Sequence, residues 1–340
     1  MKAYQDASLA PARRAKALLE EMTLAEKVGQ LNQRLYGFRI YERKCINGED
    51  TIELSEEFRQ EVEKYSGLGV LYGLYRADPW ADKNYETGLT GVLSKKAYNQ
   101  VQRYVLEHSR LGIPVMMSSE CPHGHQALDG YLLPVNLLAG ATFDPAMVRA
   151  AYRVSGRQLQ NMGVDLALMS MLDVLRDPRW GRSEECYSED PYLSARMAEA
   201  AVIGMQESGP EVVAKHFAAQ GEGTGGVNAS AARIGERELR EIHFPPAAAA
   251  IKAGAKGIMA AYNEIDGVYC HANRWLLNDV IRKEMGFDGI VMSDGVAIDQ
   301  LDSMTGDNVM SGALALQSGV DVGLWDEAFG KLEEAVRRGL

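Results

Sequence analysis

The sequence has no apolar run of about 18 residues or more, the length that a membrane-spanning helix needs. It has only four cysteines (Cys45, Cys121, Cys186 and Cys270), which are far apart and form no CxxC pair. This spacing predicts neither a disulfide framework nor a zinc knuckle. The N-terminal stretch lacks the apolar core of a signal peptide, so we expect a cytoplasmic location.

The sequence also has few positive charges relative to negative ones, with 36 Lys and Arg, 47 Asp and Glu, and a net charge of −11. Nucleic acids and anionic membrane surfaces repel a negatively charged protein, so we expect neither as a partner. His123 and His125 lie two apart, but no further ligands nearby complete a metal site. No GxGxxG follows the first apolar run, and the glycine-rich stretch 221–226 lacks the Lys-Ser/Thr of a phosphate loop. We therefore expect no metal or organic cofactor, and a mobile loop at 221–226.

Short apolar runs alternate with helix-like stretches along the chain. Asp144-Pro145 and Asp190-Pro191 each place an Asp cap before a Pro in the first turn, with a Gly past the end. The predicted strands are 69–72, 113–117, 166–169, 212–214, 257–260, 290–292 and 319–322. The predicted helices between them are 94–112, 144–163, 190–209, 236–254 and 272–286.

This alternation is typical of a parallel β/α architecture. Seven strands in about 270 residues favour a (β/α)8 TIM barrel over a doubly wound sheet. An eighth strand is not evident, so we expect one irregular or missing unit. Residues 1–340 are interpreted as a single barrel domain in which residues 1–65 form N-terminal helices and a charged extension. Within it, Thr23 and Glu26 form a capping-box pattern that predicts two short helices over residues 11–32.

Polar side chains follow the predicted strands at the points where the strands end. In a β/α barrel these ends converge on one face, where catalytic groups lie. Carboxylates, Arg and Lys can hydrogen-bond vicinal hydroxyls, and aromatic rings can cover the apolar face of a sugar. The polar stretches are Ser118-Ser119-Glu120, Asp173 with 176–182, Lys215-His216-Phe217, Tyr262-Asn263-Glu264 and Ser293-Asp294.

Each of these groups taken alone has a structural explanation. Asp294 could cap a turn. The pair Lys215 and His216 could bond to the backbone, and one of Arg179 and Arg182 is expected to anchor its loop through a neighbouring carboxylate. Their common placement at strand ends favours a site.

Five motifs, in order, resemble glycoside hydrolase family 3 in its N-terminal barrel domain. The resemblance runs from about residue 10 to the end of the sequence, and the combination is highly specific. The motifs are RDPRWGR at 176–182, SEECYSEDPY at 183–192, KHFA at 215–218, MAAYN at 259–263 and VMSD at 291–294.

The resemblance implies a retaining β-glycosidase in which Asp294 is the nucleophile and Tyr262 stands beside it. A second carboxyl about 5–5.5 Å away would protonate the leaving oxygen. Lys215 and nearby hydrogen bonds are expected to keep Asp294 ionised. The residues that the resemblance implies for binding sugar hydroxyls are Glu120, Arg182, Lys215 and His216.

The sequence departs from the family pattern at three places. Gly295 follows the nucleophile where the family usually has Trp, so one wall of the sugar subsite must come from elsewhere. Glu120 replaces the usual Asp and is one methylene longer. The acid/base of family β-glucosidases commonly lies on a second, α/β sandwich domain, which appears absent here. Loop 218–223 lacks the Asp-His dyad of the hexosaminidases, and Glu222 is interpreted as a loop charge.

The sequence therefore predicts a β-glucosidase that removes terminal non-reducing β-D-glucosyl residues. Its acid/base would come from a C-terminal sandwich domain or a second chain. Two alternatives stay open: a β-xylosidase or other exo-β-glycosidase, and a catalytically weak sugar-binding barrel.

Overall fold

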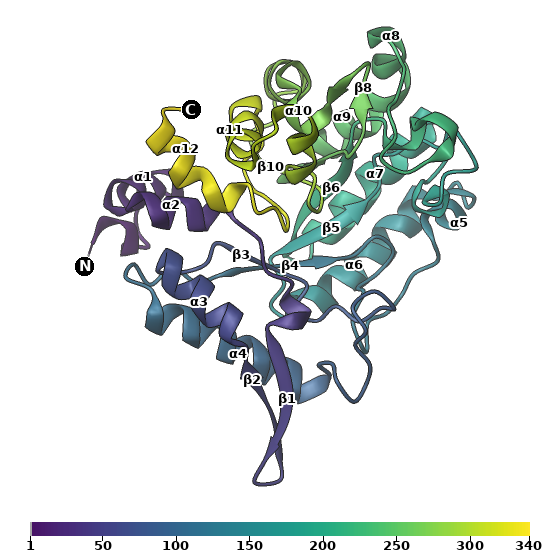
Figure 1. Cartoon of the computed structure of the whole chain (residues 1–340). Coiled ribbons are helices and arrows are strands. Elements are labelled where there is room, and N and C mark those ends of the chain that lie inside the picture. The colour runs from purple at the N-terminus through teal and green to yellow at the C-terminus, as the bar shows by residue number, and fades with distance from the viewer. Residues whose placement is uncertain (1) are drawn as a thin grey trace.

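Six parallel strands form one curved sheet in the computed structural model, which describes residues 2–340 (Figure 1). Their order is β10-β7-β6-β5-β4-β3. The strands are β3 (Val70–Tyr72), β4 (Met116–Glu120), β5 (Leu166–Ser170), β6 (Glu211–Phe217), β7 (Gly257–Ala260) and β10 (Ile290–Met292). Six of the seven predicted strands are thus confirmed, and so is the TIM-barrel-like fold class. The seventh, 319–322, is not a regular strand.

Two irregular segments, residues 31–36 and 320–325, lie between the edge strands β3 and β10. Each is attached to its edge strand by a parallel bridge, and backbone hydrogen bonds of 2.9 Å join the two segments to each other. The bridges pair Tyr36 with Tyr72 and Val322 with Met292, and the hydrogen bonds run from Gly323 to Leu31 and from Trp325 to Gln33. The ring is therefore complete, and segment 31–36 supplies the unit that the sequence did not reveal.

The inside of the ring is a separate apolar cluster, formed by alternate residues of the strands. The other strand residues face outward and pack against the helices, as expected for parallel strands buried on both sides. Gln33 crosses the interior, accepting a 2.5 Å hydrogen bond from Ser118. The strand residues of the cluster are Val70, Tyr72, Leu166, Leu168, Val213, Met259, Ile290 and Met292, and segment 320–325 adds Val322 and Leu324.

The helices surround the sheet (Figure 1), and those that the sequence predicts begin within a few residues of the predicted positions. Thr23 and Glu26 form the expected capping box between α1 and α2, and Asp144 and Asp190 cap α6 and α7. The α-helices are α1 (Pro11–Glu21), α2 (Leu24–Leu31), α3 (Glu56–Tyr65), α4 (Gly91–His108), α5 (Asn136–Gly140), α6 (Pro145–Asn161), α7 (Pro191–Gln206), α8 (Glu236–Glu238), α9 (Phe244–Lys252), α10 (Asp302–Thr305), α11 (Asn308–Ser318) and α12 (Leu332–Arg338). Segments Leu239–His243 and Trp275–Glu284 are π-helical. No helix within residues 2–340 is long and apolar enough to cross a membrane.

The charged region before residue 65 is more ordered than the sequence analysis expected. It contains the antiparallel hairpin β1 (Tyr41–Ile46) and β2 (Glu49–Leu54), which projects from the barrel (Figure 1), and then α3. Asn47 and Gly48 at its tip have φ of 53° and 81°, as a two-residue type I′ turn requires. A second, short hairpin, β8 (Glu264–Ile265) and β9 (Val268–Tyr269), follows β7. The stretch 220–226 forms two 3-10 turns, Gln220–Glu222 and Thr224–Gly226, and its mobility stays a prediction.

Candidate active site

Asp294 lies just beyond the end of β10, and its side chain is nearly buried. Its Oδ1 accepts a 2.8 Å hydrogen bond from the Gly295 backbone N–H. Its Oδ2 lies 3.5 Å from His216 Nε2 and, within residues 2–340, has no hydrogen-bond partner. The Tyr262 hydroxyl donates to the Gly295 carbonyl at 2.9 Å, so Tyr262 stands beside the carboxylate as expected. Burial, and then the charge of Asp294, raises the pKa of Tyr262, which keeps its hydroxyl protonated as a donor.

A histidine that the sequence analysis missed holds the backbone of Asp294. The Asp294 N–H donates to His271 Nε2 at 3.1 Å. Burial lowers the pKa of His271 to about 4, so the ring is neutral at physiological pH and can accept this hydrogen bond. His271 lies in the 3-10 turn Cys270–Ala272, far from any predicted strand end, and no local sequence signal marks it.

His216, at the end of β6, lies between a carboxylate and a guanidinium. Its Nδ1 is 2.7 Å from Asp173 Oδ2, and its Nε2 is 3.0 Å from Arg182 Nη2. Because a guanidinium only donates hydrogen bonds, Nε2 must accept, and the proton is assigned to Nδ1. Asp173 therefore fixes the tautomer of His216 and the plane of its ring beside Asp294.

Arg182 is held by a buried carboxylate. Glu185 accepts two hydrogen bonds from the guanidinium, at 2.7 and 2.9 Å, and a third from the Ser170 hydroxyl. Burial would raise the pKa of Glu185, but the hydrogen bonds and charge of Arg182 outweigh it and hold that pKa far below its usual range. Arg179, in contrast, is exposed and pairs with Asp177, which is the loop-anchoring role expected for one of the two arginines.

Glu120, at the end of β4, is the centre of a second polar cluster. It accepts hydrogen bonds from Lys215 Nζ at 2.7 Å and from the Tyr72 hydroxyl at 3.1 Å, and Arg76 lies 3.9 Å away. Burial by itself would raise the pKa of Glu120, but the charges of Lys215 and Arg76 hold it below its usual value. Tyr72 and Arg76 were not among the predicted site residues, although Tyr72 ends a predicted strand.

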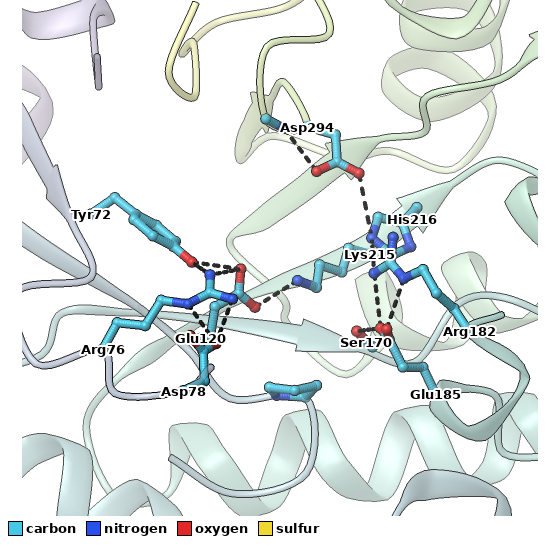
Figure 2. Close-up of polar contacts among 12 residues, drawn as sticks. Tyr72, Arg76, Asp78, Glu120, Ser170, Arg182, Glu185, Lys215, His216 and Asp294 are labelled. Atoms are coloured by element: carbon cyan, nitrogen blue, oxygen red, sulfur yellow. Dashed lines mark hydrogen bonds and ion pairs between the residues drawn. The ribbon is translucent and has the colours of Figure 1, made fainter. Parts of the chain in front are cut away.

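The partner of Lys215 differs from the expected one. The sequence analysis expected Lys215 to help keep Asp294 ionised, whereas the structure pairs its ammonium with Glu120. The basic groups on the side of Asp294 are His216 and the Arg182 bonded to it. Figure 2 shows Asp294 directed toward His216 and Arg182, with the Lys215–Glu120 pair beside them. The six predicted residues therefore lie at one end of the barrel.

This arrangement suits a ligand with many hydroxyls. Glu120 and Glu185 are charged acceptors, the cations beside them are donors, and one oxygen of Asp294 accepts no hydrogen bond from the described residues. Within residues 2–340, no group of three or more His, Cys, Asp or Glu side chains is placed to hold a metal ion. His125 is buried and hydrogen-bonded to Ser119 at 2.9 Å.

Comparison with known proteins identifies the family. The family description "Glycosyl hydrolase family 3 N terminal domain" matches residues 23–340. A putative beta-xylosidase of Formosa agariphila is 32% identical, and the alignment covers 99% of this chain and 44% of that protein. A periplasmic beta-glucosidase of Salmonella typhimurium is 31% identical, with 92% of this chain and 37% of that protein covered.

Solved structures agree with this result. The β-glucosidase EmGH1 of Erythrobacter marinus superposes with a TM-score of 0.85 at 32% identity, covering 99% of this chain and 43% of that one. The beta-glucosidase of Listeria innocua in complex with glucose gives 0.81 at 28% identity, with 96% and 44% covered. The chain thus spans less than half the length of these relatives. With a family match over residues 23–340 and a shared fold over nearly its whole length, the chain belongs to glycosyl hydrolase family 3.

Proposed function

We propose that this chain carries the nucleophile half of a retaining exo-β-glycosidase that removes terminal non-reducing β-D-glucosyl residues. The observation that carries the proposal is Asp294 Oδ2, which lies at the end of a barrel strand, 3.5 Å from His216 and without a donor among residues 2–340. The names of the relatives, β-glucosidases and β-xylosidases, support the reaction class.

In the proposed reaction, the Asp294 carboxylate forms a bond to the anomeric carbon as the bond to the leaving oxygen breaks. That oxygen takes a proton from an acid, and water later cleaves the glycosyl ester and returns a proton to the same group. The Gly295 N–H donates to Oδ1 of Asp294, and the Tyr262 hydroxyl donates to the Gly295 carbonyl beside it. Glu120, Lys215 and Arg182 would bind the sugar hydroxyls.

The acid/base must have a carboxyl whose pKa is raised and which can reach the leaving oxygen. Glu120 and Glu185 do not fit, because the cations paired with them lower their pKa values. Glu222 does not fit either, since the His243 ring, 3.5 Å away, lowers its pKa and it also pairs with Arg176.

Asp326 has a raised pKa but the wrong position. Burial raises its pKa to about 7, yet its side chain is enclosed and its oxygens accept hydrogen bonds from Ser293, Leu324 and Ile298. We therefore propose that a C-terminal α/β sandwich domain or a second chain supplies the acid/base. The greater length of the relatives supports this assignment.

A β-xylosidase is the second candidate, and one residue favours it. Glu120 is one methylene longer than the Asp usual in the family and is held in place by Lys215 and Tyr72. A longer arm reduces the room for the exocyclic hydroxymethyl group that a glucoside has and a xyloside lacks. The ratio of kcat/KM for dinitrophenyl β-xyloside and β-glucoside measures the preference.

Covalent labelling tests the nucleophile without the acid. The chain is incubated with a 2-deoxy-2-fluoro-β-glucoside bearing a dinitrophenyl leaving group, which departs without protonation, and with the matching xyloside. Intact-mass measurement and peptide mapping should find one glycosyl adduct, on Asp294, and none on the Asp294→Asn variant. An adduct with the xyloside alone would select the second candidate. A folded protein that reacts with neither reagent would contradict the proposed mechanism and favour a sugar-binding barrel.

A further inference from the structure

The residue after Asp294 has no room for a side chain. A Cβ on Gly295 would lie 2.3 Å from Cε3 and 2.4 Å from Cζ3 of Trp325, far inside contact distance. The backbone of Gly295 does not have the positive φ that calls for glycine. Space, rather than backbone conformation, therefore requires glycine here, and the indole of Trp325 fills that space.

Trp325 also reaches the other side of the site. Its ring packs edge-on against Tyr72 at a centroid distance of 4.8 Å, and the Tyr72 hydroxyl donates to Glu120. The indole thus lies between the nucleophile strand and the Glu120 cluster. Trp325 adopts a left-handed backbone, with φ of 64°, which costs roughly 1–2 kcal/mol for a residue other than glycine. The backbone N–H of Trp325 donates to the Gln33 carbonyl at 2.9 Å across the barrel closure, which holds this conformation in place.

Two further aromatic rings support the indole of Trp325 from one side. Tyr36 stacks on Trp325 at 4.8 Å, Trp80 lies at 5.1 Å, and Tyr36 and Trp80 are 5.7 Å from each other. Two rings on opposite faces of Trp325 would be separated by nearly the sum of the first two distances. Tyr36 and Trp80 therefore pack on the same side of Trp325 and support it from there.

We infer that Trp325 is the aromatic wall against which the apolar face of the sugar packs at Asp294. It takes the place of the side chain that Gly295 lacks, and Tyr36 and the half-exposed Trp80 back it. This inference rests on the proposed function, because the sugar is the ligand of the same site. An aromatic ring suits it because the C–H face of a pyranose is apolar and packs on a π face.

The test compares Trp325→Ala, Trp325→Phe and the double variant Trp325→Ala/Gly295→Trp. Trp275→Phe, in the outer π-helical segment, is the matched control. Each protein is assayed with dinitrophenyl β-glucoside and β-xyloside, and its Kd for isofagomine is measured by calorimetry. We expect Trp325→Ala to weaken isofagomine binding and to lower kcat/KM by about tenfold or more, with Trp325→Phe between it and the parent. The double variant should recover part of the loss, because its new indole starts from Gly295 and occupies the vacated space.

The possible results distinguish a failure of the Trp325 inference from a failure of the proposed function. If Trp325→Ala is folded and its Kd and kcat/KM are unchanged, the inference that Trp325 packs against the sugar is wrong, and the proposed function is unaffected. A parent protein that neither binds isofagomine nor cleaves either glycoside overturns the proposed function, and the wall with it. Thermal unfolding of each variant is measured alongside. If Trp325→Ala does not fold, Trp325→Leu replaces it, since leucine keeps apolar volume but has no π face.

Discussion

Lys215 and Glu120 form the most consequential ion pair in the barrel interior. Their charged atoms are 2.7 Å apart, and the side chains are only 6% and 11% exposed. Removing one partner of such a pair leaves an uncompensated buried charge, which costs about 3–5 kcal/mol. Arg76, 3.9 Å from Glu120, and the Tyr72 hydroxyl remain after Lys215→Met. We therefore expect the lower end, a loss of about 3 kcal/mol in the free energy of unfolding.

The assay is urea denaturation at pH 7, followed by circular dichroism, for the parent, Lys215→Met, Glu120→Gln and the double variant. The double variant should lose less free energy of unfolding than the two single variants added together, by about 1 kcal/mol or more, because neither charge of the pair is then left without its partner. Lys2→Met is the control, because Lys2 and Glu21 pair at the surface with 50% and 41% exposure, and it should leave the urea midpoint essentially unchanged.

The same pair predicts a dependence on pH. The pKa of Glu120 lies below its usual 4.5 in the folded protein, so the folded state binds fewer protons than the unfolded state as the pH falls. The stability from ionised Glu120 is fully present above pH 4.5 and is lost as the pH falls through the folded pKa. Glu120→Gln should lack this acid-induced loss. The buried-pair reasoning is refuted if Lys215→Met is as stable as the parent at pH 7. It is also refuted if the parent and Glu120→Gln lose stability equally in acid.

Three further predictions follow from single contacts. Asp294→Asn should abolish turnover of dinitrophenyl β-glucoside. Its urea midpoint should equal or exceed that of the parent, because the change removes a buried charge whose Oδ2 has no donor within residues 2–340. A lower midpoint would contradict this. Thr23→Ala should lower the free energy of unfolding by about 1 kcal/mol through loss of the capping box, and an unchanged urea midpoint would refute that role. The pKa of Asp326 is raised from 3.8 to about 7, so the folded state holds a proton that the unfolded state has released, and stability should fall as the pH rises across that interval. Asp326→Asn should remove this slope, and a variant with the parental slope in urea titrations from pH 4.5 to 8 would exclude Asp326 as its source.

Local signals predicted those parts of the fold that local interactions determine. Asp144 and Asp190 cap helices through contacts three residues away, and each such pattern is visible in the sequence. The β1–β2 hairpin also had a local signal, Asn47-Gly48, which the charged composition of the region obscured. Segment 31–36 had none, because it joins the ring through a bridge to Tyr72 and hydrogen bonds to residues 323–325.

The predicted site residues meet because strand ends converge, but their partners depend on register. Lys215 could reach either of two carboxylates at strand ends, and the pairing of β6 with β5 and of β5 with β4 directs it to Glu120. His271 and Trp325 could not be identified, since each reaches Asp294 or its neighbour from a segment more than 20 residues away in sequence.

The closure of the ring has a consequence for how the chain folds as it is synthesised. Segment 31–36, which seals the barrel beside β3, is synthesised long before its partner, residues 320–325. Until then, segment 31–36 and β10 are edges with unpaired backbone groups, which can pair with other chains. Contacts between such distant segments also slow folding, because a long loop must close before they form. A nascent chain stalled before Gly319 would therefore be an open sheet that depends on chaperones, whereas synthesis of residues 320–325 would allow it to close into a sealed barrel.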